Sequence, residues 1–121
     1  MKFKFFETAG RAAIRHSTHP IFRMGSVLVQ KNRIVSIGSN LRRTHPKSPS
    51  KWKTIHAEFD AIIGIDQEKL TGSTLYVARV TRTGRFASSR PCTDCMTLVR
   101  EARIFSVCYI DSNREFREEI V

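Results

Sequence analysis

Long apolar runs are missing from this sequence of 121 residues. No stretch approaches the roughly 20 apolar residues that a membrane-spanning helix requires, so we expect no membrane partner. The apolar residues at positions 1–6 meet Glu7 almost at once, so the apolar core of a secretory signal is missing and a cytoplasmic location is expected. Cysteine is also scarce, and 3 is an odd number for a disulfide scaffold. We expect a single domain over residues 1–121.

Acidic residues are absent between Glu7 and Glu58 and again between Lys69 and Thr93. Across the chain, 21 basic residues face 11 acidic ones, for a formal net charge of +10. The two acid-free stretches carry Arg11, Arg15, Arg23, Lys31, Arg33, Arg42, Arg43, Lys47, Lys51 and Lys53, and then Arg79, Arg82, Arg85 and Arg90. A phosphorylated substrate or a polyanion is the natural partner of such a charge distribution, and a generally basic, solvated surface is the alternative.

The apolar pattern predicts one sheet with helices packed on it. Predicted helices cover residues 7–15 and 54–63, and a third begins at Pro91. Predicted strands cover residues 24–30, 33–38, 74–80 and 104–110, the first two joined as a hairpin. Residues 40–53 are expected to form a long loop.

Only eleven residues follow Ile110, too few for a crossover helix and another parallel strand. If this tail adds a strand, it must pair as a hairpin, and a short helix is the competing interpretation. The expected sheet therefore has four to five strands.

Three residues at two predicted helix starts have the character of metal ligands. A hydrolytic zinc site needs three protein ligands and one open position for water, and His56, Cys92 and Cys95 supply that number. The two cysteines are three residues apart in a helix and so point the same way. Glu58 then serves best as a general acid and base beside the water. A redox pair of cysteines is the alternative, but it leaves His56 and Glu58 unexplained.

His56-Ala57-Glu58, a strand, and then Pro91-Cys92-x-x-Cys95 together resemble the signature of the zinc-dependent cytidine and deoxycytidylate deaminase superfamily. The resemblance covers about residues 24–110 and includes the order of elements. It implies a three-layer α/β fold, a mixed sheet with helices on both faces, and zinc as cofactor. It also implies that Glu58 carries a proton from water to the ring nitrogen and then to departing ammonia, while the backbone N–H of Ala57 contacts the base carbonyl.

Substrate contacts are predicted on and beside the long loop. By the resemblance, Asn40 matches an asparagine that holds the sugar, although a turn residue is an equal alternative. Trp52 lies in a loop with Arg42 and Arg43, a mixture that suits base stacking beside phosphate binding. The equal alternative for Trp52 is that it anchors its own loop to the core.

The remaining thiol and imidazoles are expected to stay outside the zinc site. Cys108 lies in a predicted apolar strand and is expected to be a buried small residue. His16, His19 and His45 have no partner at ligand spacing and are expected on the surface. The zinc site would therefore keep its open position.

Three functional hypotheses follow from these patterns. The first is hydrolytic deamination of cytosine in a pyrimidine nucleoside or nucleotide of the CMP or dCMP type; by resemblance, the Ser-rich approach to Pro91 favours cytosine over adenine as the base. The second is cytosine deamination in single-stranded DNA or RNA, with the basic loop along the backbone. The third is a catalytically silent nucleic-acid-binding module, against which Glu58 argues. Small deaminases of this kind often assemble, so a homo-oligomer is also considered.

Overall fold

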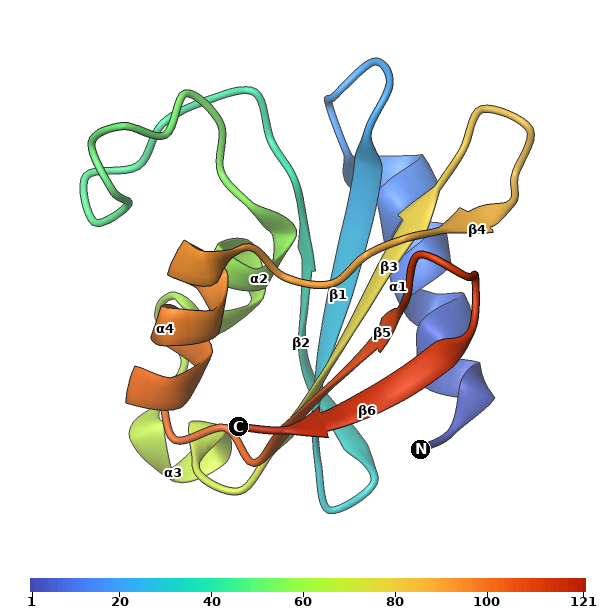
Figure 1. Ribbon diagram of the computed structural model, residues 1–121. Coiled ribbons are helices and arrows are strands. Elements are labelled where there is room, and N and C mark those ends of the chain that lie inside the picture. The colour runs from blue at the N-terminus through green and yellow to red at the C-terminus, as the bar shows by residue number, and fades with distance from the viewer.

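A mixed β-sheet forms the centre of the structure, and helices cover both of its faces (Figure 1). The computed structural model describes all 121 residues. In chain order the elements are α1 (Phe3–His16), β1 (Arg23–Gln30), β2 (Arg33–Ser39), α2 (Ala57–Ile62), α3 (Gln67–Leu70), β3 (Thr74–Val80), β4 (Phe86–Ala87), α4 (Thr93–Glu101), β5 (Ser106–Ile110) and β6 (Phe116–Ile120). The predicted three-layer α/β architecture is confirmed. No helix in it combines the length and the apolar character that crossing a membrane would take.

The strands lie in the order β2-β1-β3-β5-β6, and the short β4 pairs with β3. Only β3 and β5 are parallel, with α4 in the connection between them. The sheet has six strands, one more than the upper end of the prediction. The extra strand is β4, where Phe86 and Ala87 pair with the end of β3. Two residues are too few to show a strand period in the sequence.

The tail after Ile110 forms β6, which is antiparallel to β5. Asp111 holds the turn between them, because its Oδ1 accepts the backbone N–H of Asn113 at 2.8 Å and that of Glu115 at 2.9 Å. Of the two alternatives for this tail, the hairpin is therefore the one that forms, and the short helix does not.

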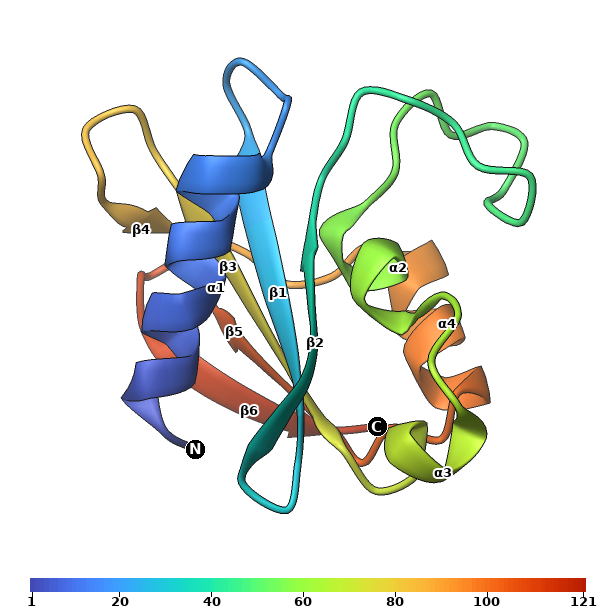
Figure 2. The same ribbon diagram turned by 180° about the vertical axis from the view of Figure 1, so that it is seen from behind.

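Alternate residues of the central strands pack on opposite faces of the sheet, as the pleat requires. Val27 and Val29 of β1 pack against α1, whereas Leu28 between them packs with Ala61 of α2 and Val99 of α4. Figure 2 shows α1 alone on one face and the other helices on the opposite face. The polypeptide thus has an apolar layer on each side of one sheet.

The N-terminal helix is longer than the sequence pattern predicts. It begins at Phe3 rather than Glu7, because Phe5 and Phe6 are buried against the sheet. The single turn of α3 was not predicted, since four residues carry no helical period.

Gly38 lets α2 lie directly against β2. A Cβ atom at this position would overlap the carbonyl oxygen of Ala57 and the backbone nitrogen of Ala61. Side chains from the sheet also hold the carbonyl groups of these two residues: Ser36 Oγ donates to Ala61 O, and Ser26 Oγ donates to Ala57 O at 2.7 Å. These contacts fix α2 on the sheet.

Candidate metal centre and active site

His56 is the N-cap of α2, with an extended backbone at φ −76° and ψ 150°. The helix therefore begins at Ala57, and its N-cap lies two residues after the cap predicted at Thr54. An N-cap position leaves the His56 side chain beside the start of the helix rather than along its packed face.

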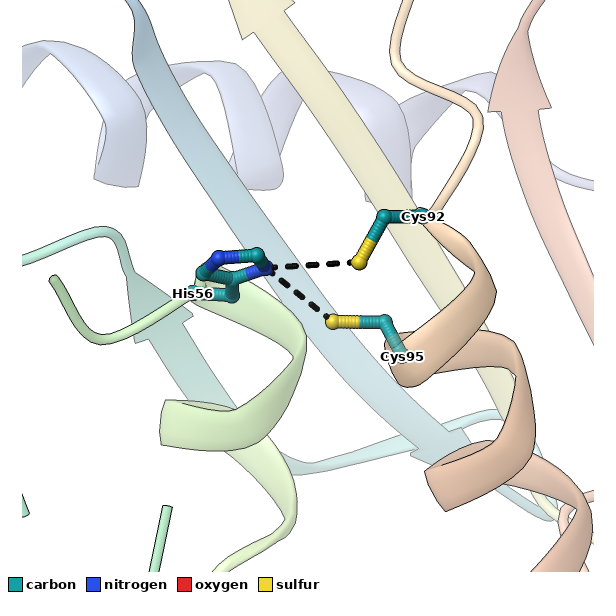
Figure 3. A group of neighbouring side chains, drawn as sticks. All are labelled: His56, Cys92 and Cys95. Atoms are coloured by element: carbon teal, nitrogen blue, oxygen red, sulfur yellow. Dashed lines mark hydrogen bonds between the residues drawn. The ribbon is translucent and has the colours of Figure 1, made fainter. Parts of the chain in front are cut away.

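Cys92 is likewise the N-cap of α4, and Cys95 lies in the first turn of that helix. Pro91 precedes the helix instead of opening it, which corrects the predicted helix start. The extended backbone of Cys92, at ψ 170°, explains the difference. The two thiols nevertheless point to the same side, toward the start of α2 (Figure 3).

The three predicted ligands come together although they are far apart in the chain. His56 Nδ1 lies 3.6 Å from Cys92 Sγ and 3.4 Å from Cys95 Sγ. The ligand atoms of all three residues lie within 4.8 Å of one another. Zinc bonds of usual length at a tetrahedral angle would place an imidazole nitrogen and a thiolate about 3.6 Å apart. The group is therefore arranged as a zinc site with one coordination position to spare.

Burial sets the protonation of these ligands. It lowers the pKa of His56, against an opposing effect of Asp94, and so favours the neutral imidazole that binds metal. Burial also raises the pKa of the Cys95 thiol, with the charges of Glu58 and Cys92 adding to the effect. A bound cation would reverse this preference, because metal binding and loss of the thiol proton are coupled.

Glu58 lies in the first turn of α2 with its side chain only 3% exposed. Burial raises the pKa of its carboxyl group, although hydrogen bonds with its own backbone and with Cys95 oppose the shift. A carboxyl group with a raised pKa is suited to accept a proton and pass it on near neutral pH.

A pocket of about 270 Å³ opens onto this group. Its walls include Glu58, His56 and Cys92 together with Asn40. The remaining lining residues are His19, Phe22, Met24, Thr54 and Arg90. The metal ligands and the buried carboxyl group thus face one space that a small molecule could enter.

Asn40 lies on the pocket wall, and its amide group also supports the surrounding chain. Its Oδ1 accepts hydrogen bonds from Ser17 Oγ and from the backbone N–H of Met24, and its Nδ2 donates to the carbonyl of Phe22. Ala57, the other predicted contact, is fully buried between His56 and Glu58.

The loop residues predicted to contact substrate lie outside this pocket. Arg42 and Arg43 are exposed, and neither lines it. Trp52 is 9% exposed, and its indole ring stacks on the imidazole of His56. The structure therefore favours the alternative in which Trp52 anchors its own loop, because the ring face turned to His56 is closed to a substrate base.

Five of the pocket residues were not predicted as site residues, among them the charged or titratable His19 and Arg90. His19 was expected on the surface, but it is half-buried on the pocket wall, where its Nδ1 accepts the backbone N–H groups of Ile21 and Phe22. Arg90 was counted only as part of the basic stretch. Its position two residues before Cys92 was the available signal.

Cys108 is fully buried in β5 and packs on the α1 side of the sheet, as predicted. Burial raises its pKa to about 12, so it is an inert thiol in the core. It is not part of the group formed by His56, Cys92 and Cys95.

One imidazole and two thiol groups beside a buried carboxyl group, at helix starts on an α/β sheet, correspond to the metal ligands and the glutamate of the zinc-dependent deaminases. The chain belongs to the cytidine and deoxycytidylate deaminase family, whose zinc-binding region matches residues 2–111. The match covers both motifs and all of the sheet except β6.

Solved structures share this fold. A cytidine deaminase from Burkholderia pseudomallei is similar with a TM-score of 0.70 and 18% identity, over 99% of this chain and 92% of that one. A dCMP deaminase from the cyanophage S-TIM5, in its apo form, is similar with a TM-score of 0.52 and 21% identity, over 88% and 82% of the two chains. The same phage enzyme in complex with dCMP and dUMP gives a TM-score of 0.51 and 20% identity over 88% and 81%. No curated protein sequence matches this chain.

Proposed function

We propose that this protein is a zinc-dependent hydrolytic deaminase that converts cytosine to uracil in a pyrimidine nucleoside or nucleotide. The observation that carries the proposal is the convergence of Glu58 with His56 and Cys92 on one pocket. A purely structural zinc site would have no need of a buried carboxyl group beside an open coordination position.

Each group in the pocket has its own role in the proposed reaction. Zinc, when bound, activates water as a nucleophile. Glu58 accepts one proton of that water and delivers it to the ring nitrogen, and then takes the proton of the hydroxyl group added to the ring carbon and delivers it to the amine, which leaves as ammonia when the C–N bond breaks. Asn40 holds the sugar, and the backbone N–H of Ala57 holds the base carbonyl.

A nucleotide of the CMP or dCMP type satisfies two separate observations. The family and the size of the pocket suit a single pyrimidine unit, and the formal charge of +10 favours a phosphorylated substrate. The similarity to a phage enzyme solved with dCMP and dUMP supports the same substrate class.

The decisive experiment measures ammonia release from cytidine, deoxycytidine, CMP, dCMP, single-stranded DNA and single-stranded RNA, with zinc content determined on the same sample. Turnover of a free nucleoside or nucleotide with about one zinc per chain is the expected result. A fully zinc-loaded protein that deaminates none of these compounds would leave the silent binding module as the better explanation.

The second candidate is cytosine deamination in single-stranded DNA or RNA. It is favoured by Arg42 and Arg43, which are exposed outside the pocket where a longer chain could pass. The dependence of substrate binding on ionic strength distinguishes the two candidate functions. Binding of a polynucleotide should weaken steeply with ionic strength, whereas one phosphate contact should change little.

A further inference from the structure

Arg90 is the only lysine or arginine among the nine residues that line the pocket. It lies in the connection between β4 and α4, two residues before Cys92. Neither Arg42 nor Arg43, the arginines predicted to meet the substrate, reaches this space. Any fixed positive side-chain charge inside the pocket therefore comes from Arg90.

The backbone that carries Arg90 is fastened to the sheet. Ser89 donates through Oγ to the carbonyl of Val77 at 2.7 Å, and its Oγ accepts the backbone N–H of Ile110 at 2.9 Å. Ser89 N–H also donates to the carbonyl of Ile110 at 2.8 Å. Pro91 follows and is buried. Arg90 is thus held between two fixed residues even though its own side chain is exposed.

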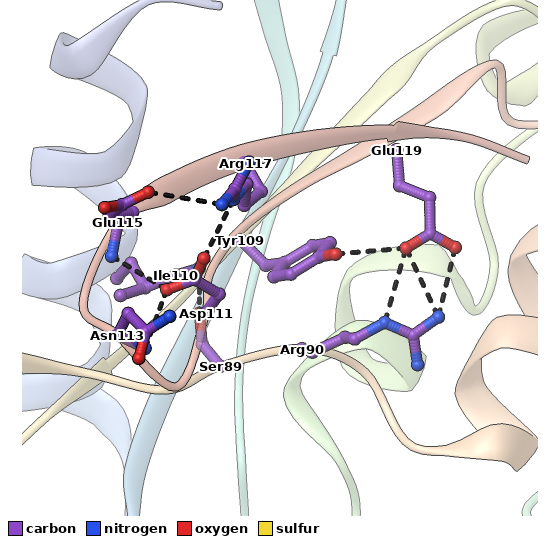
Figure 4. Close-up of polar contacts among 9 residues, drawn as sticks. All are labelled: Ser89, Arg90, Tyr109, Ile110, Asp111, Asn113, Glu115, Arg117 and Glu119. Atoms are coloured by element: carbon purple, nitrogen blue, oxygen red, sulfur yellow. Dashed lines mark hydrogen bonds and ion pairs between the residues drawn. The ribbon is translucent and has the colours of Figure 1, made fainter.

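The guanidinium group is oriented by the C-terminal strand (Figure 4). Nε and Nη2 of Arg90 donate to Glu119 Oε1 at 3.3 and 3.2 Å, and Nη2 also donates to Oε2 at 3.1 Å. Tyr109 OH donates to the same Glu119 Oε1 at 3.1 Å. One edge of the planar group is therefore occupied by Glu119. The Nη1 amino group has no hydrogen-bond partner in the protein.

An oriented guanidinium with a free amino group is suited to bind an anion, because its plane and its donors are already in place. The anionic part of a pyrimidine nucleotide is its phosphate. Buried Glu58 lines the pocket beside His56 and Cys92, so the base must react there and the phosphate has to lie toward another part of the wall. Among the lining residues, Arg90 alone offers a permanent positive charge there.

We propose that Arg90 binds the phosphate monoester of a free nucleotide and thereby determines the preference for nucleotide over nucleoside. This inference rests on the proposed deaminase function for the identity of the base. It differs from the sequence-based expectation, which assigned phosphate contacts to the loop that carries Arg42 and Arg43. Those two residues remain available to a longer nucleic acid.

The test compares binding of dUMP and deoxyuridine to the zinc-loaded full-length protein by calorimetry, so that no turnover is required. The wild-type protein should bind dUMP more tightly than deoxyuridine. Arg90→Gln should weaken dUMP binding by about 10- to 100-fold, the usual effect of losing a hydrogen bond to a charged group, and leave deoxyuridine binding nearly unchanged. Arg117→Gln is the matched control, because Arg117 is also ion-paired, to Asp111 and Glu115, and lies away from the pocket.

Glu119→Gln provides a variant that should gain affinity. The amide oxygen of glutamine still accepts a hydrogen bond from Arg90, but the negative charge that opposes a phosphate is gone. Binding of dUMP should therefore become a few-fold tighter, a result that misfolding does not produce.

A short single-stranded oligonucleotide is the third probe, and its binding should depend on Arg42 and Arg43 more than on Arg90.

The proposal is overturned if the wild-type protein binds the two small ligands equally, if Arg90→Gln weakens both to the same extent, or if Glu119→Gln weakens dUMP binding. An oligonucleotide that depends on Arg90 while dUMP does not would also overturn it, in favour of a phosphodiester. The ammonia-release assay tests the proposed deaminase function independently of these binding measurements. If Arg90→Gln no longer binds dUMP more tightly than deoxyuridine, that result would support the role of Arg90 even if cytosine were not the base that reacts.

Discussion

The indole ring of Trp52 lies flat on the imidazole ring of His56, with 3.7 Å between ring centroids and 1° between the planes. The indole nitrogen of Trp52 also donates to Asp94 Oδ2 at 3.4 Å, and Lys51 Nζ lies 2.9 Å from the same oxygen. Asp94 belongs to α4, between the two cysteine ligands. The 40–53 loop is therefore tied to both helices that carry the metal ligands.

Because Trp52 restrains the ring of His56, we predict that Trp52→Ala weakens zinc binding by about 10- to 100-fold, as is usual for residues that orient metal ligands. Competition with a chromogenic chelator measures the change. Lys53→Ala is the control, since Lys53 is exposed in the same loop and should leave zinc affinity unchanged. Equal zinc affinity of Trp52→Ala and wild type would show that the stack does not orient the ligand.

Glu58→Gln should retain about one zinc per chain but lose about 10²- to 10⁴-fold in ammonia release, the usual contribution of a general acid and base. The amide keeps the size of the side chain but has no proton to transfer at neutral pH. Glu68→Gln, an exposed change in α3, should have wild-type activity. Substantial activity in Glu58→Gln would require another group to move the proton.

Gly38→Ala should destabilise the fold by about 1–3 kcal/mol, the usual range for overpacking a close contact. The added methyl group would meet the backbone of α2 at Ala57 and Ala61, which has little freedom to move away. Gly10→Ala is the control, because a Cβ atom there meets a ring carbon of Phe86 at 3.0 Å and the helix gains a better helix former. Thermal unfolding of the two variants should differ clearly, and similar melting temperatures would contradict the close approach of α2 to β2.

Hydrogen bonding to Arg117 holds the pKa of the Asp111 carboxyl group below its ordinary value, and the backbone N–H of Glu115 adds to this effect. A depressed pKa means that ionised Asp111 stabilises the fold above the unfolded-state pKa, and that this contribution is lost as the pH falls through the folded-state pKa. Asp111→Asn should therefore melt below wild type at pH 7, with a difference that disappears in strong acid.

The measurement is the melting temperature of both proteins from pH 7 down to pH 2. Asparagine retains an oxygen for the backbone N–H groups of the turn, so the comparison isolates the ion pair. A difference that stays constant with pH would assign the effect to the turn rather than to the charge.

The sequence by itself determined the class of fold and the metal ligands, because both depend on short-range patterns. The predicted bounds of β3 match the structure, since β-branched or apolar residues occupy all of its positions but that of Arg79 and leave little ambiguity. The motif His56-Ala57-Glu58 and the pair Cys92 and Cys95 mark the ligand group through their spacing together with their resemblance to the deaminase signature. For the residues after Ile110 the sequence left a hairpin and a short helix as alternatives, and the pairing of β6 with β5 decided between them.

Only the tertiary structure decided what surrounds the metal ligands. Arg90 meets Glu119 across 29 positions of the chain, and Trp52 meets Asp94 across 42. No local period relates such residues, because their contacts depend on how the sheet brings β6, α4 and the 40–53 loop together. Arg42, Arg43 and Trp52 lie in the same loop, and all three were predicted to contact the substrate. Packing separated them, since only the tryptophan had apolar surface to bury against His56 and Phe59.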